Sequence, residues 1–344
     1  MIMRKLQKTT LIGLALTSAA ANAIPEIPTV TGWSGHIGLG AGAGSSESNM
    51  LASISSIDLG DERVSGLDQS PDDEDIVLPT LPFEAAYTLA DSGTQLFIGS
   101  RQARHFSLDV DTTMYLQFGA RQSVGEVGVV AFSYVASTIA TDVWKDPYLV
   151  DEERGDTERT SKGVQIEWGN IFGTPLEFYW SSREIEIDDE RSGQDGEMNL
   201  TSDQQRALRR SGEVYRVELN YDWQINDRHS LVPGIGYIDE DLDGSAMAQD
   251  GLLLQLEHVY DRDRWSLVSK VYVQDLESDT SNPIYGDSND VETIGGSVTA
   301  YYKRPFGLEN WTANAGVLYY EGDSNNDFYD SSLSLFSLGM LYRF

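Results

Sequence analysis

The stretch DEDLDGSAMAQD at 239–250 has the spacing of a calcium-binding loop. Asp239, Asp241 and Asp243 alternate before a glycine, and Asp250 closes the stretch. Alternate carboxylates can converge on one cation, and the glycine permits the sharp turn that such a loop requires. Asp250 stands where a longer glutamate is usual. The spacing predicts a weak Ca²⁺ site, and the alternative is a chance match in an acidic segment.

A second candidate is RHFSLD at 104–109, where His105, Ser107 and Asp109 share one face of an extended segment. A base, a hydroxyl and a carboxylate can together make a hydrolytic set. Catalytic triads usually converge from separate segments, whereas these three side chains follow one another along one strand. We interpret them as polarity at the rim of a fold, and we expect no enzymatic activity.

The kind of element that positions these residues can be inferred from the end of the chain, SLFSLGMLYRF. Its apolar or aromatic residues alternate with others, as a strand with one apolar face requires. These residues are Phe336, Leu338, Met340, Tyr342 and Phe344. An apolar strand face that ends the chain on an aromatic residue is typical of an outer-membrane β-barrel, where that face meets lipid.

The same alternation recurs through the chain and gives about fourteen strands. The alternative is twelve strands, because the region 80–138 is least clearly divided. The segments lie near 32–44, 80–90, 94–104, 106–122, 124–138, 161–171, 175–188, 212–225, 229–240, 250–260, 264–277, 291–304, 310–321 and 332–344. We predict an all-β fold, a transmembrane antiparallel up-and-down β-barrel.

The connections support this fold over a soluble β-sandwich, because short turns alternate with long loops as in bacterial barrels. The long connections lie near 45–79, 139–161, 184–212, 239–250, 275–292 and 321–330. The connection 102–111 is the short exception. Five of the seven tryptophans also lie near the first strand's start or a short turn, at one level of the barrel. Indole rings prefer the membrane boundary, so short turns are expected in the periplasm and long loops outside.

The first residues read as a signal peptide. Residues 1–23 comprise a basic head, a short apolar run and an Ala-Asn-Ala cleavage signal, and residues 24–344 form the expected barrel domain. The chain has no cysteine, which excludes disulfides and thiolate metal sites. The expected location is the outer membrane of a Gram-negative bacterium.

Three short segments carry a resemblance to a known family: IPEIP at 24–28, TGWSGHIGLGAG at 31–42 and LYRF at 341–344. They resemble an uncharacterised family of gammaproteobacterial outer-membrane proteins that is catalogued as a domain of unknown function. The resemblance implies the barrel and its location, and it supplies no activity or site.

The net charge of −31 lies almost entirely in the six long loops. Such a charge argues against nucleic acid as a partner. Acidic loops around an opening raise the local concentration of cations. The segment 201–210 is expected to form a helical turn with a capping box, and it holds the basic cluster Arg206, Arg209 and Arg210. Lipopolysaccharide phosphate and neighbouring acids are the two candidate partners of that cluster.

Charged residues out of phase with the lipid-facing positions are expected to line the lumen. They are Glu84, Arg101, Arg121, Glu167, Glu177, Arg183, Arg216, Glu218, Asp222, Glu257, Lys270, Lys303 and Arg343. Their signs nearly balance, so the lumen can either hold water or close through paired charges. The loop 45–79 is long enough to fold inward, although the sequence does not show that it does.

We predict a passive, porin-like channel for small solutes with a cation-attracting extracellular mouth. The alternative is a non-conducting structural barrel that binds lipopolysaccharide, a phage or a host surface. Expected partners are outer-membrane lipids, lipopolysaccharide and the barrel assembly machinery, which would read the last strand. Small residues on the lipid face near the seam also predict a homo-oligomer. They are Ala41, Ala43, Gly296, Ala300, Ala313 and Ala315.

Overall fold

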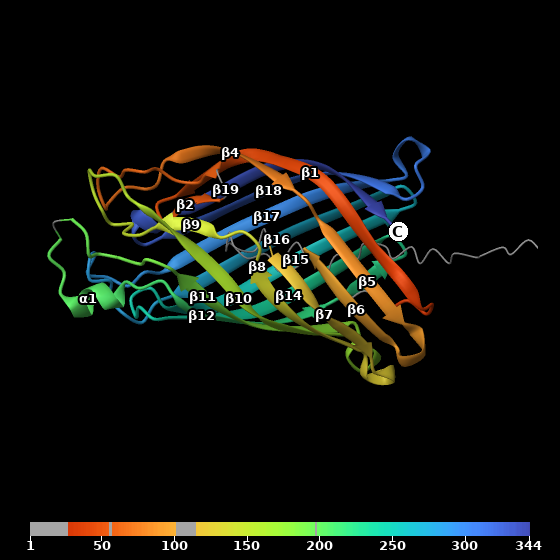
Figure 1. Cartoon of the computed structure of the whole chain (residues 1–344). Coiled ribbons are helices and arrows are strands. Elements are labelled where there is room, and N and C mark those ends of the chain that lie inside the picture. The colour runs from red at the N-terminus through yellow and green to blue at the C-terminus, as the bar shows by residue number, and fades with distance from the viewer. Residues whose placement is uncertain (1–26, 55–56, 101–114, 197) are drawn as a thin grey trace, which may run out of the picture.

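A computed structural model describes residues 27–54, 57–100, 115–196 and 198–344. The described chain forms a closed antiparallel β-barrel of fourteen wall strands (Figure 1). Two of the fourteen strands are interrupted and therefore carry two labels each. One consists of β4 and β5, and the other consists of β12 and β13. The wall strands are β1 (Gly32–Ser48), β4 (Asp73–Thr80), β5 (Phe83–Leu89), β6 (Thr94–Ser100), β7 (Tyr115–Ser123), β8 (Val129–Ser137), β10 (Asp156–Gly169), β11 (Leu176–Ile187), β12 (Gly212–Tyr221), β13 (Trp223–Asn226), β14 (His229–Leu242), β15 (Gln249–Arg262), β16 (Trp265–Glu277), β17 (Val291–Lys303), β18 (Trp311–Ser324) and β19 (Ser331–Arg343).

The last strand closes the barrel onto the first. β1 and β19 pair antiparallel from His36 opposite Arg343 to Ser48 opposite Ser331. At the chain end the backbone N–H of Gly35 donates to the carbonyl of Phe344, and the N–H of Phe344 donates back, both at 3.0 Å. Closure leaves no unpaired edge between these two strands.

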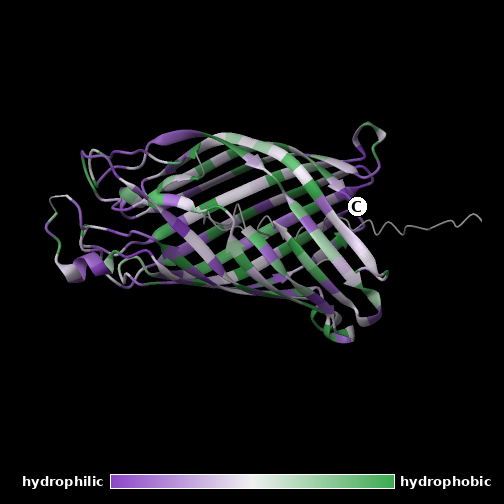
Figure 2. Ribbon diagram, in the orientation of Figure 1, coloured by the Kyte–Doolittle hydropathy of each residue, from purple (hydrophilic) through white to green (hydrophobic). Residues whose placement is uncertain are grey.

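Hydrophobic and hydrophilic residues alternate in short bands along the wall strands (Figure 2), as an outer apolar and an inner polar face require. On β15, Leu254 is 51% exposed, whereas its neighbour Leu253 is 1% exposed. The exposed apolar residues therefore point away from the barrel, where hydrocarbon would cover them.

Aromatic pairs gather at the end of the barrel that carries the short turns. Trp265 packs on Tyr302 with ring centroids 4.6 Å apart, and Trp311 packs on Tyr342 at 5.3 Å. Trp33 similarly meets Tyr87 at 5.2 Å. These rings form the expected belt at the periplasmic boundary of the membrane.

The short turns are built mostly from single turns of 3-10 helix and from tight hairpins. The 3-10 elements at this end are η1 (Ala90–Ser92), η3 (Gly125–Val127), η4 (Ile171–Gly173) and η5 (Pro305–Gly307). At the opposite end, the loops carry the short strands β2 (Leu51–Ile54), β3 (Ile57–Asp58) and β9 (Thr141–Trp144), together with α1 (Ser202–Ala207) and η6 (Asp327–Tyr329).

The helix α1 confirms the predicted helical turn. The hydroxyl of Thr201 accepts from the backbone N–H of Gln204, and the Gln204 side chain accepts from the backbone N–H of Thr201, which completes a capping box. In the part of the chain that the structure describes, no helix is long and apolar enough to cross a membrane.

The first long loop is shorter than its predicted span of 45–79, and this boundary was wrong at both ends. β1 continues to Ser48, and β4 occupies 73–80, where Glu47 pairs opposite Asp73. The acidic start of β4 and its Pro79 look like a loop in sequence, but these acids lie at the polar extracellular rim. The exposed connection is therefore 49–72.

Two other predictions concern residues outside the described part of the chain. The signal peptide, 1–23, lies there, and so does the short connection 102–111.

Candidate functional site: the lumen and its extracellular cap

Twelve of the thirteen predicted lumen residues occupy inner-facing positions of the wall strands, and Arg101 lies outside the described residues. The twelve are Glu84, Arg121, Glu167, Glu177, Arg183, Arg216, Glu218, Asp222, Glu257, Lys270, Lys303 and Arg343. Side-chain alternation sets this orientation, because each is out of phase with the exposed apolar residues of its own strand.

The carboxylate of Glu84 on β5 receives a two-pronged contact from Arg121 on β7. The two guanidinium nitrogens of Arg121 donate to the two carboxylate oxygens of Glu84 at 2.7 and 3.1 Å, and one of them also donates to Gln95 at 2.8 Å. The guanidinium lies 4.0 Å from the ring centroid of Phe97. A paired geometry of this kind fixes both side chains in direction as well as charge.

A second polar group occupies the inner wall of β12, β15 and β16. Arg216 pairs with Glu218, and the side-chain amide of Gln255 donates to Glu218 at 2.9 Å and to Asn220 at 2.7 Å. Glu257 and Lys270 stand opposite each other in the β15–β16 register. The charges of this wall are therefore arranged as pairs of opposite sign.

Nearer the periplasmic end, Lys303 on β17 binds both carboxylate oxygens of Asp261 on β15, at 2.8 and 3.1 Å. These two side chains remain 17% and 22% exposed, and Glu84 is also 22% exposed. Solvent therefore reaches the inner-facing charges near the periplasmic opening, whereas Glu218, Glu257 and Lys270 on the wall of β12, β15 and β16 are buried.

The extracellular half of the lumen carries an apolar layer that the sequence analysis missed. It comprises inner-facing residues of β11, β12, β14, β15, β16 and β18, packed in one cluster, with Leu318 and Leu333 against it. The buried members are Ile185, Val214, Ile238, Leu253, Tyr272, Leu276 and Tyr320. The available signal was a loss of alternation, since Leu252–Leu254 and Val271–Val273 are unbroken runs of apolar or aromatic residues.

The hairpin β2–β3 of the first extracellular loop packs against inner-facing side chains. Ile54 and Leu59 form a buried cluster with Ile76 of β4, and Leu333 and Leu335 of β19 pack against it. The inner position of Ile76 follows from its outward neighbour Val77, which is 64% exposed while Ile76 is 1% exposed. The first loop therefore folds inward and narrows the extracellular half of the lumen.

The β2–β3 hairpin is also hydrogen-bonded, through β9, to the part of the barrel wall that contains β10. β2 pairs antiparallel with β9, which in turn pairs with β10 of the wall. The hydroxyl of Ser53 donates to the Asp142 carboxylate at 2.9 Å. The first loop thus spans from the inner faces of β4 and β19 to an extension of β10.

Above this layer, the extracellular loops share one hydrophobic core, which we call the loop cap. Its buried members are Tyr148, Leu208, Met247, Phe328 and Tyr329. Apolar residues from the first loop, from the loops around 200 and 284 and from the end of β14 pack against them. These are Met50, Val64, Leu67, Met198, Leu200, Leu242, Ile284 and Tyr285. Six separate loops therefore contribute to a single packed unit over the extracellular end of the barrel.

Buried hydrogen bonds join the loops of the cap. The Tyr148 and Tyr329 hydroxyls lie 2.8 Å apart, and the Asn282 amide donates to the Tyr329 hydroxyl at 2.8 Å. Burial raises the pKa of the Tyr329 hydroxyl to about 12, with both hydrogen bonds acting in the opposite direction. The tyrosine hydroxyls therefore act as neutral hydrogen-bonding groups.

Two buried charged side chains organise the backbone of the cap. The Asp146 carboxylate accepts the backbone N–H groups of Tyr148, Gly193 and Asp195 at 2.8–3.0 Å. Burial nevertheless raises the pKa of Asp146 above its ordinary value, against the effect of these donors. Its contacts fix the loop around 146 to the loop that precedes α1.

Arg154 joins the first loop to the connection between β9 and β10. Its guanidinium donates to the carbonyls of Asn49 and Pro147 at 3.0 and 3.1 Å and also to the carbonyl of Asp61. It stacks over the Trp144 ring at 4.5 Å. Burial lowers the pKa of Arg154 to about 10, so the side chain stays charged at neutral pH.

The predicted basic cluster of residues 206–210 is divided between two environments. Arg210 is buried, pairs with Glu190 at 3.0 Å and donates to the Trp144 carbonyl at 2.6 Å. Arg206 pairs with Asp203 on the same helix. These two arginines therefore pair with neighbouring acids and do not form one shared basic surface.

The predicted calcium loop, 239–250, forms the extracellular tip of the β14–β15 hairpin. Asp239 and Asp241 lie on β14, and Asp250 lies opposite Asp239 on β15 and accepts from the Tyr237 hydroxyl at 2.6 Å. Asp243 lies in the connection between the strands. Nowhere in the described ranges are three or more His, Asp or Glu side chains grouped to hold a metal ion, so this hairpin does not converge the four carboxylates.

The other candidate set, His105, Ser107 and Asp109, lies outside the described residues.

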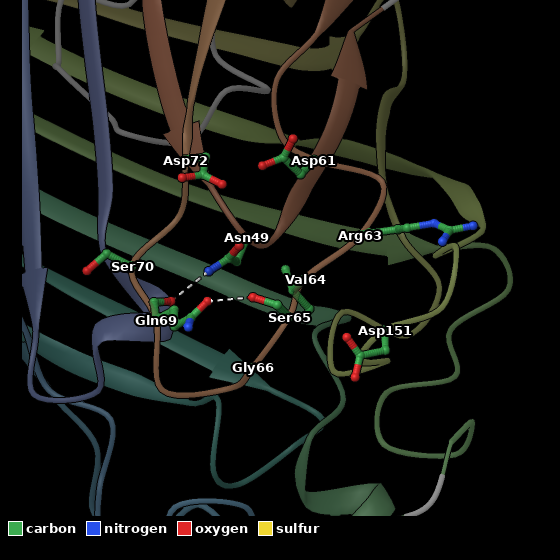
Figure 3. Close-up of a pocket in the computed structure, with 10 residues that line it drawn as sticks. All are labelled: Asn49, Asp61, Arg63, Val64, Ser65, Gly66, Gln69, Ser70, Asp72 and Asp151. Carbon is green, nitrogen blue, oxygen red and sulfur yellow. Dashed lines mark hydrogen bonds between the residues drawn. The ribbon is translucent and has the colours of Figure 1, made fainter.

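A polar hollow of about 230 Å³ opens within the first loop (Figure 3). Figure 3 shows Asp61 and Asp72 on one side of it and Asp151 on the other. Arg63 also lines the hollow, while Asn49 and Gln69 are joined by a 3.2 Å hydrogen bond. Three carboxylates against one guanidinium make this extracellular recess acidic.

Solved structures with a similar arrangement of strands are outer-membrane proteins of low sequence identity. The outer-membrane channel DcaP of Acinetobacter baumannii is 11% identical with a TM-score of 0.44, covering 91% of this chain and 97% of its own. A FadL homologue of Pseudomonas aeruginosa is 10% identical with a TM-score of 0.43, covering 90% of each chain. The CymD monoaromatic hydrocarbon channel is 11% identical with a TM-score of 0.43, covering 90% of this chain and 88% of its own.

No curated protein matches this chain. A model of a protein family does match it, over residues 32–343, from the first wall strand to the last. That range includes the inner-facing charges, the inward hairpin and the loop cap. The chain belongs to the family of proteins of unknown function DUF2860.

Proposed function

We propose that this barrel is a passive outer-membrane channel for small solutes, with an extracellular entrance narrowed by the inward hairpin and the loop cap. The observation that carries the proposal is the solvent contact of paired charges on the inner wall. Glu84, Asp261 and Lys303 face inward and remain partly exposed. Charges are costly in a dry interior, so their placement favours a lumen that holds water.

The proposed channel prefers cations. Most of the excess negative charge lies in the extracellular loops, and the recess in the first loop carries Asp61, Asp72 and Asp151. A mouth of one sign attracts ions of the opposite sign and repels those of the same sign. Added salt screens this field and would weaken the preference.

A second candidate is a non-conducting barrel that presents a fixed extracellular surface. The shared core of the loop cap favours it, because a surface that recognises a partner benefits from loops held in one arrangement. Lipopolysaccharide, bridged to the acidic loops by divalent cations, is the partner that this charge would suit.

Conductance separates the two candidates. Purified protein in a planar bilayer should carry current, and a salt gradient should give a reversal potential of the sign for cations. Silence at every voltage would remove the channel and leave the surface-binding barrel. An anion-selective current would keep a channel but contradict the acidic mouth.

A further inference from the structure

Two neighbouring short turns form a basic surface at the periplasmic end of the barrel. One turn joins β13 to β14, and the other joins β15 to β16. His229 pairs opposite Tyr260 in the β14–β15 register, and the backbone N–H of Asp261 donates to the carbonyl of Arg228 at 2.9 Å. Both turns therefore lie side by side, at the end where the C label stands in Figure 1.

Three arginines on these turns are exposed, and none of them pairs with a carboxylate of the described residues. They are Arg228, Arg262 and Arg264. The nearby carboxylates Asp261 and Asp263 are already bound, at 2.8 Å by Lys303 and at 2.7 Å by Arg304.

Asp227 is the exposed acid that remains on the first turn. The three arginines therefore outnumber it locally, in a chain whose overall charge is strongly negative.

A pair of histidines lies on the outer face just above these arginines. Nδ1 of His229 lies 2.9 Å from Nε2 of His258, and the His229 ring lies 4.9 Å from the Tyr260 ring. One nitrogen of this contact donates to the other, so whichever tautomer forms, one of the two remaining ring nitrogens carries an N–H. That group is a donor available to an external acceptor.

The depth of this surface in the membrane is marked by its aromatic neighbours. Trp223 and Trp265 are 57% and 54% exposed and lie on the strands that border the two turns. Indole rings rest at the level of lipid headgroups. The arginines, which lie on the turns just beyond these strands, therefore reach the phosphate level of the periplasmic leaflet.

We propose that Arg228, Arg262 and Arg264, with the His229–His258 pair, form a binding site for the phosphate headgroup of an anionic phospholipid. We call these five residues the periplasmic arginine patch. Guanidinium groups match phosphate oxygens in geometry and charge. The outward apolar side chains of β12 and β15, such as Leu219 and Leu256, lie beside the acyl chains of a lipid held there. Free phosphate would gain no such contact.

The test is a titration of the folded protein in detergent with short-chain phosphatidylglycerol, followed by tryptophan fluorescence and compared with phosphatidylcholine. Wild type should show saturable binding of phosphatidylglycerol and none of phosphatidylcholine. The triple variant R228Q/R262Q/R264Q should lose about tenfold in affinity, as expected for three partly screened charge contacts. His258→Ala should lose less, because it breaks the histidine pair and removes no permanent charge.

The matched control is R63Q/R191Q/R206Q, which removes the same charge from exposed arginines at the extracellular end. Its affinity should stay within about twofold of wild type, since those sites are far beyond a Debye length from the patch. Equal losses in both triple variants would assign the effect to net charge and overturn the site. Unchanged binding by R228Q/R262Q/R264Q would overturn it directly. Competition by inorganic phosphate at the same concentration as the lipid would overturn its assignment to a lipid.

Discussion

The hydroxyls of Tyr148 and Tyr329 lie 2.8 Å apart, although 181 residues separate them in the chain. One belongs to the loop between β9 and β10, and the other to the last extracellular connection. Both rings also pack on Phe328, with centroids 5.7 and 5.6 Å away. Loops that begin on opposite parts of the barrel are therefore joined through one buried aromatic contact, and they should open together rather than singly.

Phe328→Ala should loosen the loop cap without unfolding the barrel. The Phe328 side chain is fully buried, and truncation of such a ring costs about 3–5 kcal/mol of local stability. Limited proteolysis should then cleave several extracellular loops at once in the variant and few in wild type. Phe306→Ala is the control, because Phe306 is 95% exposed on a short turn. Cleavage confined to the connection 325–330 would contradict a shared core.

The cap should resist opening better in acid than at neutral pH. Burial raises the pKa of Asp146, so the folded cap holds its proton more tightly than the opened loops do. This contribution is complete below the ordinary carboxyl value of 3.8 and is lost as pH rises through the raised value. Burial acts in the same direction on Asp330.

Protease cleavage of the loops, compared between pH 4 and pH 7 with an acid-active protease, measures this effect. Asp146→Asn should flatten the pH dependence, since it removes the titrating group and leaves one acceptor. A wild-type cap that opens more readily at pH 4 would contradict the prediction.

Arg121→Gln should destabilise the barrel itself. The variant leaves the partly exposed carboxylate of Glu84 without its two-pronged partner, and loss of a hydrogen-bonded contact to a charged group costs about 1.5–3 kcal/mol. The measurement is the urea midpoint for loss of the folded, heat-modifiable band. Lys162→Gln is the control, because Lys162 pairs with Glu184 and Glu186 on the surface. Equal midpoints for wild type and Arg121→Gln would show that the pair is not structural.

The wall of the barrel could be predicted because each strand face meets a different solvent. Leu252, Leu254 and Leu256 alternate with inner-facing residues, and lipid on one side imposes that period over the whole length of β15. β4 was not predicted because Asp73 and Pro79 are residues typical of loops, and the strand extends partly beyond the membrane. At that height water surrounds the strand, and no lipid selects for apolar residues.

The loop cap could not be predicted, because its core is built from isolated residues in acidic segments. Tyr148, Leu208 and Phe328 follow no common period, and their contacts depend on where six loops meet in space. The inner-facing charges could be identified from strand phase alone, whereas their partners could not. Glu84 finds Arg121 across the intervening strand β6, a distance of 37 residues that no spacing rule specifies.

The small residues of the lipid face should support a homo-oligomer. The structure brings them to neighbouring strands, where Ala300 lies opposite Ala315, and Ala315 and Ala41 both lie opposite Leu338. Close approach of backbones in lipid favours association through such a surface. Cysteine placed at Ala315 should crosslink between copies in the membrane, while cysteine at the exposed Phe132 of β8, on the far wall, should not. Equal crosslinking at both positions, or none at either, would count against this face.

The central claim is that a water-filled, cation-preferring lumen lies beneath a cap that restricts it, and single-channel recording under a salt gradient tests it most directly. Wild type should pass a small current with a reversal potential of the sign for cations, and the preference should fall as salt rises. Phe328→Ala should raise the conductance severalfold and keep that sign, because the cap loosens while the acidic residues remain. Silence in both proteins, or a reversal potential of the sign for anions, would contradict the account.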